Sequence, residues 1–519
     1  MPTYLSPGVY VEEAQSGSRP IEGVGTSVAA FVGFAEKGPF HEPTLVTNWS
    51  QYTSAFGDFA EGCYLGHAVY GYFANGGGIA YVVRIGGAAG SAADSTAPRL
   101  PAGAPLALGS FTVAALPGVD AARTTVEVVY PEGENVPEDR FRLIVSQDGK
   151  PVENYDVSSR RNVKNYVVTQ VRERSKLITV EEPAKSEAPA RPQPQSLALL
   201  PAAAPAPGPS AAVLPATLSP QEYIGDAEAR TGFAGLEAVD EITMVAVPDL
   251  MAAYLNGTVD ADGVKAVQLA MITHCELMGD RLAVIDPLPD LTPRQVSVWR
   301  TSQAGYDSKY AALYYPWIKA FDPASGSNKL IPPSGHVMGV WSRSDAERGV
   351  HKAPANEVVR GALELATNVS KGEQDLLNPI GVNCIRAFPG RGVRIWGART
   401  LSSDQAWRYI SVRRLFNYLE ESILLGTQWV VFEPNDARLW GTIRRDISAF
   451  LREEWRRGAL FGASAAEAFY VKCDEETNPP ALIDAGQVVC EIGICPVKPA
   501  EFVIFRLSQY SDSTSLVAE

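Results

Sequence analysis

The fold of this 519-residue chain is decided by residues 332–365, PPSGHVMGVWSRSDAERGVHKAPANEVVRGALEL, and residues 378–423, NPIGVNCIRAFPGRGVRIWGARTLSSDQAWRYISVRRLFNYLEESI. The second stretch ends in a predicted helix, because apolar residues recur there at i, i+3 and i+4 spacing. Ser402 and Gln405 have the spacing of a capping box at its head. We expect its buried face to consist of Val412, Leu415, Phe416, Leu419 and Ile423.

This helix belongs to a C-terminal α+β domain, which we place at residues 379–500. A second helix follows, which Asn435 and Asp436 can cap. Strands are predicted at residues 429–432 and 469–473. The apolar stripe of the second helix is expected to consist of Trp440, Ile443, Ile447, Phe450 and Leu451.

Upstream, continuous apolar strands alternate with amphipathic helices. This pattern indicates a mostly parallel sheet covered on both faces. The strands are predicted at 26–34, 79–85, 242–247, 282–286 and 310–321, and the helices at 48–56, 62–73, 263–278 and 293–303. The α/β core is therefore discontinuous, with one part at 21–88 and the other at 221–378.

The block between these two parts, residues 89–220, has a different pattern. Its alternating segments predict a small antiparallel β domain with strands at 109–115, 124–130, 140–146 and 176–180. Residues 181–220 are dense in Ala and Pro, so we expect a mobile linker there. An insertion of this kind usually faces solvent.

Both ends of the chain are predicted to be arms, residues 1–20 and 501–519. The first contains a short strand at residues 9–13, and an isolated strand is not stable in water. The second begins with the run EFVIFRL at 501–507, which is apolar on both faces and needs cover on both sides. Each strand either folds back on its own domain or pairs with another subunit.

Composition excludes several classes of protein. A net charge of −14 argues against broad nucleic-acid binding, which needs a basic face. Residues 1–18 lack the pattern of a signal peptide, and no apolar stretch is long enough to span a bilayer, so we expect folding in the cytosol.

The six cysteines have no metal-ligand spacing, and we expect them to be reduced. Cys490 and Cys495 leave a predicted strand on opposite faces and do not bridge easily.

The motifs of enzymes and cofactor sites are incomplete. Gly38 is followed by Pro39, whereas a phosphate loop needs Lys and then Ser or Thr. Ser464 has a sequence context similar to that of a nucleophilic serine, but it lies in a different domain from all five histidines. We expect His336 and His351 to be structural residues in loops. We therefore predict no catalytic residue, no cofactor and no metal.

Four segments carry a resemblance to a known family: the stretch 332–423 with which we began, residues 75–85 (NGGGIAYVVRI), residues 432–436 (FEPND) and residues 499–505 (PAEFVIF). In this order they resemble the sheath proteins of contractile phage-type tails and contractile injection systems. Residues 90–220 carry no such resemblance.

The resemblance implies a multidomain α/β protein with a subtilisin-like core, an inserted antiparallel β domain, and an α+β C-terminal domain whose sheet receives arm strands from neighbouring subunits. The residues implied in strand exchange are Val9, Tyr10, Val11, Glu12, Glu13, Phe502, Val503, Ile504, Phe505 and Arg506. It also implies that the C-terminal domain grips an inner tube. On the second helix Arg438, Arg445, Arg452 and Arg456 form one stripe, which either meets that tube or is a plain solvated face.

The function implied is that of a structural subunit that polymerises helically around an inner tube and contracts to drive the tube through a target envelope. Its expected partners are copies of itself, the tube protein, and baseplate and terminal cap proteins, without nucleic acid or membrane insertion. We expect assembly in a bacterial cytoplasm, as part of a phage tail or a related particle. The alternatives are a sheath paralogue or terminal-ring protein of the same particle and, more distantly, a subtilisin-like hydrolase.

Overall fold

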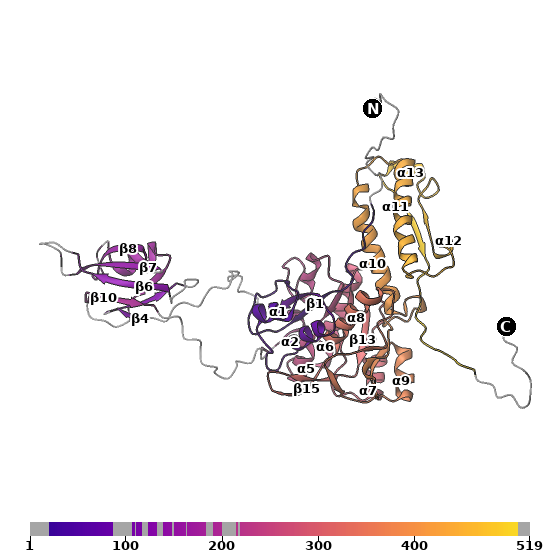
Figure 1. The fold of residues 1–519 in the computed structure, drawn as a ribbon, viewed down its shortest axis with the longest axis horizontal. Helices are drawn as coiled ribbons and strands as arrows, with labels where there is room; N and C mark the ends of the chain where they lie inside the picture. The colour runs from indigo at the N-terminus through magenta and orange to yellow at the C-terminus, as the bar shows by residue number, and fades with distance from the viewer. Residues whose placement is uncertain are drawn as a thin grey trace, which may run out of the picture. The chain divides into compact units, whose positions relative to one another are not determined.

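The computed structural model describes residues 20–86, 106–108, 110–116, 123–131, 137, 139–147, 150–161, 163, 165–182, 190–199, 214–215 and 218–506. The chain divides into two compact units (Figure 1). The first unit comprises residues 1–87 and 212–519, and the second comprises residues 88–211. No helix of the described part is both long and apolar enough to cross a membrane.

A nine-stranded sheet forms the centre of the first unit. Its six middle strands are parallel, and antiparallel strands extend it at both edges, so the predicted parallel sheet is confirmed. β1, β12 and β13 are buried on both faces, as their continuous apolar sequences require. In spatial order the strands are β16 (Glu357–Val358), β19 (Gly392–Ile395), β18 (Val382–Phe388), β13 (Ala311–Tyr315), β12 (Leu282–Ile285), β11 (Met244–Ala246), β1 (Val28–Gly33), β3 (Ile79–Arg84) and β2 (Thr44–Val46).

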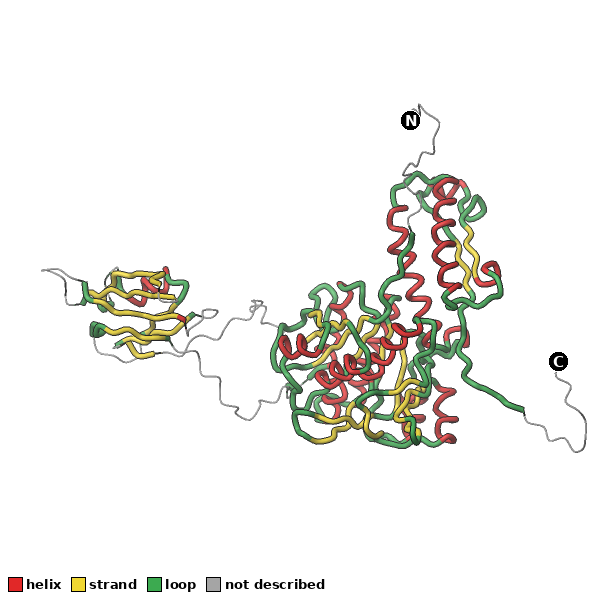
Figure 2. The backbone as a smooth tube through the Cα atoms, in the orientation of Figure 1, coloured by secondary structure: helices red, strands yellow, loops and turns green. Residues whose placement is uncertain are grey.

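Helices pack around this sheet (Figure 2). In α8 (Ser334–Arg348), every residue from Ser334 to Ser344 is buried. The glycines of this helix allow close contact with α2 (Leu65–Ala74). A Cβ atom on Gly335 would lie 2.3 Å from the backbone oxygen of Ala68, so no larger residue fits there without a backbone shift. The helices of this layer are α1 (Trp49–Phe56), α2 (Leu65–Ala74), α4 (Pro220–Ile224), α5 (Asp249–Leu255), α6 (Ala261–Met278), α7 (Pro293–Val298), α8 (Ser334–Arg348) and α9 (Lys371–Leu377).

The strand predicted at 310–321 is wrong as a single element. β13 ends at Tyr315, and Pro316 has no N–H to continue a ladder. The chain then forms β14 (Ile318–Asp322), which belongs to another sheet. There it pairs with β15 (Ser327–Ile331) and β17 (Ala362–Leu365).

The described residues of the second unit form two antiparallel sheets and one helix around their own apolar core, and the alternating segments had predicted a β domain here. The predicted mobile linker at 181–220 is wrong at β10 (Gln195–Ala198), which pairs with β6 (Thr124–Val129). The alternating sequence of β10 is a strand pattern that an argument from composition overlooks. The elements are β4 (Leu106–Leu108), β5 (Phe111–Ala115), β6 (Thr124–Val129), β7 (Arg140–Gln147), β8 (Lys150–Ser158), α3 (Val167–Arg174), β9 (Ile178–Glu181) and β10.

The C-terminal part of the first unit has a separate apolar core between two long helices and a small sheet. Asp436 caps the second helix by accepting a hydrogen bond from the backbone N–H of Leu439, as predicted. The apolar stripe of that helix is buried as expected. The elements are α10 (Ile410–Thr427), α11 (Ala437–Arg456), α12 (Ala465–Ala468), β20 (Phe469–Lys472), α13 (Pro480–Asp484) and β21 (Glu491–Ile494).

Two local predictions in this region are wrong. The capping box at Ser402 does not start α10, because Asp404 instead caps a short 3₁₀ turn and α10 begins at Ile410. The strand at 429–432 is also absent, since its first residues form a 3₁₀ turn. Phe432 has a φ of +67°, which a strand does not allow, and its side chain is fully exposed.

Candidate functional site

The small sheet of the C-terminal part has only two strands, β20 and β21, within the described residues. They are antiparallel, and one face packs on α11 through Phe469, Val471 and Ile494. Each strand therefore has one backbone edge without a strand beside it, and such edges can accept a further strand. Beyond Ile494 the chain is held against residues near the end of α11, because the N–H of Phe461 donates a hydrogen bond to the carbonyl of Cys495.

The segment from Ile21 to Thr26 runs along α10. Ile21 is buried against Gly426, and the backbone N–H of Val24 donates to Ser422 Oγ at 3.1 Å. Thr26 lies near Arg414, so the segment spans most of the helix. The chain therefore enters the described structure near the C-terminal end of α10. The candidate residues Val9, Tyr10, Val11, Glu12 and Glu13 precede this point and lie outside the described residues.

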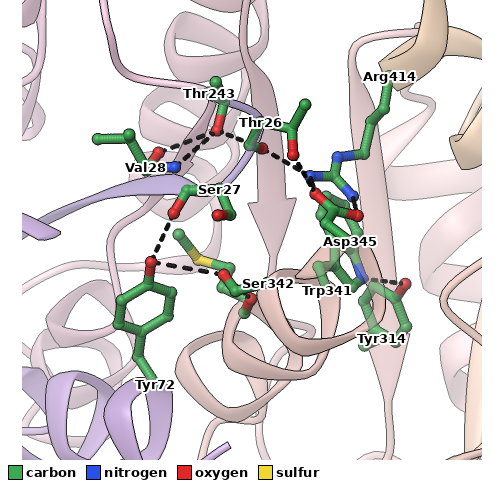
Figure 3. Close-up of polar contacts among 11 residues, drawn as sticks. Thr26, Ser27, Val28, Tyr72, Thr243, Tyr314, Trp341, Ser342, Asp345 and Arg414 are labelled. Atoms are coloured by element: carbon green, nitrogen blue, oxygen red, sulfur yellow. Dashed lines mark hydrogen bonds and ion pairs between the residues drawn. The ribbon is translucent and has the colours of Figure 1, made fainter. Parts of the chain in front are cut away.

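A buried ion pair fixes this segment and α10 to the core (Figure 3). Both guanidinium NH₂ groups of Arg414 donate to the two carboxylate oxygens of Asp345, at 2.6 and 2.9 Å. Thr26 donates its hydroxyl to Asp345 and accepts from Arg414 at its backbone carbonyl, both at 2.8 Å. The two charged side chains are only 3% and 4% exposed. One bidentate pair thus joins α8, α10 and the N-terminal segment.

Glu501 holds the chain at the opposite end of α10. Its carboxylate accepts from Arg399 at 2.6 and 2.9 Å, from Asn378 Nδ2 at 2.7 Å and from the Tyr409 hydroxyl at 3.1 Å. Burial raises the pKa of Glu501, but hydrogen bonds from Arg399 and Asn378 outweigh it, so the pKa lies below its ordinary value. The carboxylate is therefore ionised at neutral pH and anchors the chain before the last apolar run.

The residues after this anchor are apolar and exposed. Phe502, Val503, Ile504 and Phe505 are 69–85% exposed and lie in no helix or strand. Four consecutive apolar side chains exposed to water are unfavourable. Because Tyr409 immediately precedes α10, this run leaves the fold at the N-terminal end of an 18-residue helix, about 27 Å long. The two chain ends therefore depart from opposite ends of α10.

The four arginines of the predicted stripe are all exposed on α11. Two of them have acidic neighbours: Arg445 contacts Asp446 at 3.2 Å, and Arg456 contacts Glu453 at 3.5 Å. Asp446 itself is buried. Neither Arg438 nor Arg452 has an ion pair among the described residues, so their charges face solvent.

One histidine has an acidic partner: His67 Nε2 lies 3.3 Å from Asp322 Oδ1, and both side chains are buried. The prediction of His336 in a loop is wrong: His336 lies inside α8, which begins at Ser334. Burial lowers its pKa to about 4, with His67 as a further cause, so it is neutral at pH 7. In the described part of the chain, no three His, Cys, Asp or Glu side chains lie where they could hold a metal ion together.

Sequence analysis missed both anchors of the chain ends. Arg413 and Arg414 interrupt the apolar face of α10, and charges at buried positions signal buried partners. The partner of Arg414 is 69 residues away in the chain, and that of Arg399 is 102 residues away. Charge alone does not identify partners at such distances.

Two family models match adjoining parts of this chain. Residues 229–401 match the model of the phage tail sheath protein central domain, and residues 402–509 match that of the phage tail sheath C-terminal domain. Together these adjoining matches cover more than half of the chain.

Curated relatives include a tail sheath protein of Vibrio phage KVP40, 28% identical over 198 residues, which are 37% of this chain and 29% of that protein. A putative prophage major tail sheath protein of Pseudomonas aeruginosa is 26% identical over 47% of this chain and 62% of its own length. The tail sheath protein of Salmonella phage ViI is 28% identical over 44% of this chain and 37% of its own length. The chain thus spans less than two thirds of each of these relatives.

Two solved structures share the fold. One is the helical sheath of the anti-feeding prophage in its contracted state, with a TM-score of 0.58 over 98% of this chain and 100% of that chain. The other is the sheath complex of the PVC extracellular contractile injection system, also contracted, with a TM-score of 0.57 over 98% and 99%. Sequence identity is 23% in both cases.

Proposed function

This chain belongs to the phage tail sheath protein family, and we propose that it is a structural subunit of the sheath of a contractile particle, a phage tail or a related injection device. One observation supports this most directly: a sheet with open edges and an exposed apolar run lie in the same C-terminal part of the molecule. An unpaired strand and an unfilled sheet edge in one chain are complementary between copies. In this role the protein is not an enzyme and needs no cofactor.

The proposed contact is strand exchange. Phe502–Arg506 of one subunit would add to the β20–β21 sheet of a neighbour, and Val9–Glu13 would add to that of another. Each backbone hydrogen bond contributes only about 0.5–1.5 kcal/mol, but a strand makes several of them. Donor and acceptor surfaces differ, so the contact does not close on itself and generates a helical array. The anchors at Glu501 and Thr26 would transmit force from the arms to the core.

The proposed lattice surrounds an inner tube and associates with a baseplate and terminal cap, assembled in the cytoplasm of a bacterium. We further propose that the exposed stripe of α11 faces the tube. Unpaired charges that reach solvent favour weak, salt-sensitive contacts, which can break during contraction. The subtilisin-like character of the core remains a prediction.

Reversing the two solvent-facing charges tests the tube contact. We expect Arg438→Glu with Arg452→Glu to reduce co-assembly with the inner-tube protein of the particle at least tenfold, because attraction becomes repulsion. Co-sedimentation at low and high salt is the measurement, and Arg160→Glu in the second unit is the control. Unchanged co-assembly would mean that the stripe is only a solvated face.

Deleting residues 1–17 tests the strand exchange. We expect a folded, soluble subunit that no longer polymerises, because the arm contributes to neighbours and not to its own core. Negative-stain electron microscopy of the full-length protein should show hollow helical cylinders, and the deletion should show none. Normal cylinders from the deletion would contradict the exchange. Small rings from the full-length protein would instead favour a paralogue that caps the sheath.

A further inference from the structure

Two free cysteines stand opposite each other at the end of the β20–β21 sheet. The register of the two strands pairs Lys472 with Glu491, so the next residues along, Cys473 and Cys490, face each other directly. The two thiols lie close enough that each is among the causes of the other's shifted pKa. Cys473 is 1% exposed and Cys490 is half-buried, so only the second is accessible to a reagent.

The spacing of opposed residues suits a disulfide. Directly opposite residues of an antiparallel pair have Cα atoms about 4.5 or 5.5 Å apart, depending on the hydrogen-bonding pattern. Disulfides span Cα separations of about 4.4–6.8 Å. The Cα separation of either kind of opposed pair therefore lies within the range that a disulfide spans.

The Asn478 side chain binds the backbone of the residue after Cys473, Asp474, and of the residue before Cys490, Val489. Its side chain accepts from the N–H of Val489 at 2.7 Å and donates to the carbonyl of Val489 at 3.0 Å. It also donates to the carbonyl of Asp474 at 3.1 Å. Since Asn478 is 1% exposed, this clamp is shielded from water and holds residues 474 and 489 together. The adjoining cysteines are thereby preorganised.

We propose that Cys473 and Cys490 are a modification site at which a small-molecule disulfide, such as oxidised glutathione, introduces a cross-strand disulfide. The Cys490 thiolate attacks one sulfur of the reagent and releases a first small thiolate. The Cys473 thiolate then attacks Cys490 Sγ and releases a second. Two protein thiols are oxidised, one small disulfide is reduced to two thiols, and the two protons pass to the released thiolates.

The bond would close residues 474–489 into a covalent loop and tie β21 to β20. If the proposed function holds, this sheet carries the arms of neighbouring subunits, and the bond would keep it intact under load. Formation of the bond in the isolated subunit does not depend on that function. The two proposals can therefore fail separately.

The chemistry also predicts a pH dependence. Burial raises the pKa of Cys490 to about 12, and the neighbouring Cys473 is a further cause. The thiolate is therefore scarce at neutral pH, and its fraction rises about tenfold for each pH unit below that value. The rate of bond formation should rise steeply between pH 7 and pH 9.

The experiment uses the full-length protein carrying Cys495→Ser, which removes the exposed thiol. The reduced protein is incubated with oxidised glutathione, alkylated while still folded and analysed by intact mass and peptide mapping. We expect a loss of two hydrogen atoms and a linked pair of peptides containing Cys473 and Cys490. Cys490→Ser should abolish the link, whereas Cys63→Ser, at a buried thiol elsewhere, should leave it unchanged.

A different outcome would overturn the proposal. If Cys490 stops at the mixed disulfide with glutathione, the two sulfurs do not reach each other in solution. If both thiols remain reduced at pH 9 in the Cys495→Ser protein, while Cys495 of the unsubstituted protein reacts with the same reagent, the site is closed to the reagent. Electron microscopy of the oxidised protein then tests separately whether the bonded sheet still supports assembly.

Discussion

Replacing Phe502, Val503, Ile504 and Phe505 by serine is expected to abolish polymer formation and to leave the stability of the subunit unchanged. The four side chains are 69–85% exposed, so the isolated fold gains little from them. In a neighbour, two such side chains on the buried face of an added strand would contribute about 3–6 kcal/mol. Their loss weakens each contact about 10²- to 10⁴-fold. Electron microscopy and sedimentation measure the polymer, and chemical unfolding measures the stability.

Two double variants sharpen this test. Alternate residues of a strand point to opposite faces, and one face of the β20–β21 sheet packs on α11. If the arm adds as a strand, Phe502→Ser with Ile504→Ser and Val503→Ser with Phe505→Ser should impair assembly unequally. Equal effects would indicate an arm that docks without strand geometry.

Surface hydrophobicity needs its own control. Leu277 and Leu255 are 83% and 48% exposed and lie on α6 and α5. Replacing both by serine removes comparable apolar surface and should leave polymers intact. A loss of stability in the arm variant would show instead that the run folds back on its own domain, which was the alternative drawn from the sequence.

The core was predictable because its signal is local. Continuous apolar runs such as β1 and β12 can form only where both faces of a strand are covered, so the parallel sheet followed from periodicity alone. The failures occur where a local signal has two solutions. Residues 402–405 can cap an α-helix or a 3₁₀ turn; here they cap the 3₁₀ turn, and α10 begins only at Ile410.

The candidate site was predictable only in part, for a related reason. Exposed arginines on α11 followed from helical periodicity, and the apolar run after Glu501 is visible in the sequence. Contacts between distant segments were not predictable. We compared Cys490 with Cys495, its neighbour in sequence, whereas the structure places it opposite Cys473, because strand register is set by packing and not by spacing.

Asp345→Ala is expected to destabilise the first unit by about 3–5 kcal/mol, because it leaves the buried guanidinium of Arg414 without its partner. The segment from Ile21 to Thr26 should also lose protection, since Thr26 bonds to both members of the pair. Urea unfolding measures the first effect and hydrogen exchange the second. Lys319→Ala breaks an exposed pair with Glu364 and should cost less than about 1 kcal/mol.

A double variant separates the loss of a partner from the loss of the pair itself. In Asp345→Leu with Arg414→Met no unpaired charge remains, and apolar packing against Trp341 can replace the lost contact. We expect this variant to recover most of the stability that Asp345→Ala loses. Hydrogen exchange in residues 21–26 should nevertheless stay fast, because the ionic partners of Thr26 are gone. Recovery of both properties would mean that Ile21 and Val24 alone hold the segment on α10, and that the ion pair is not needed to anchor the arm.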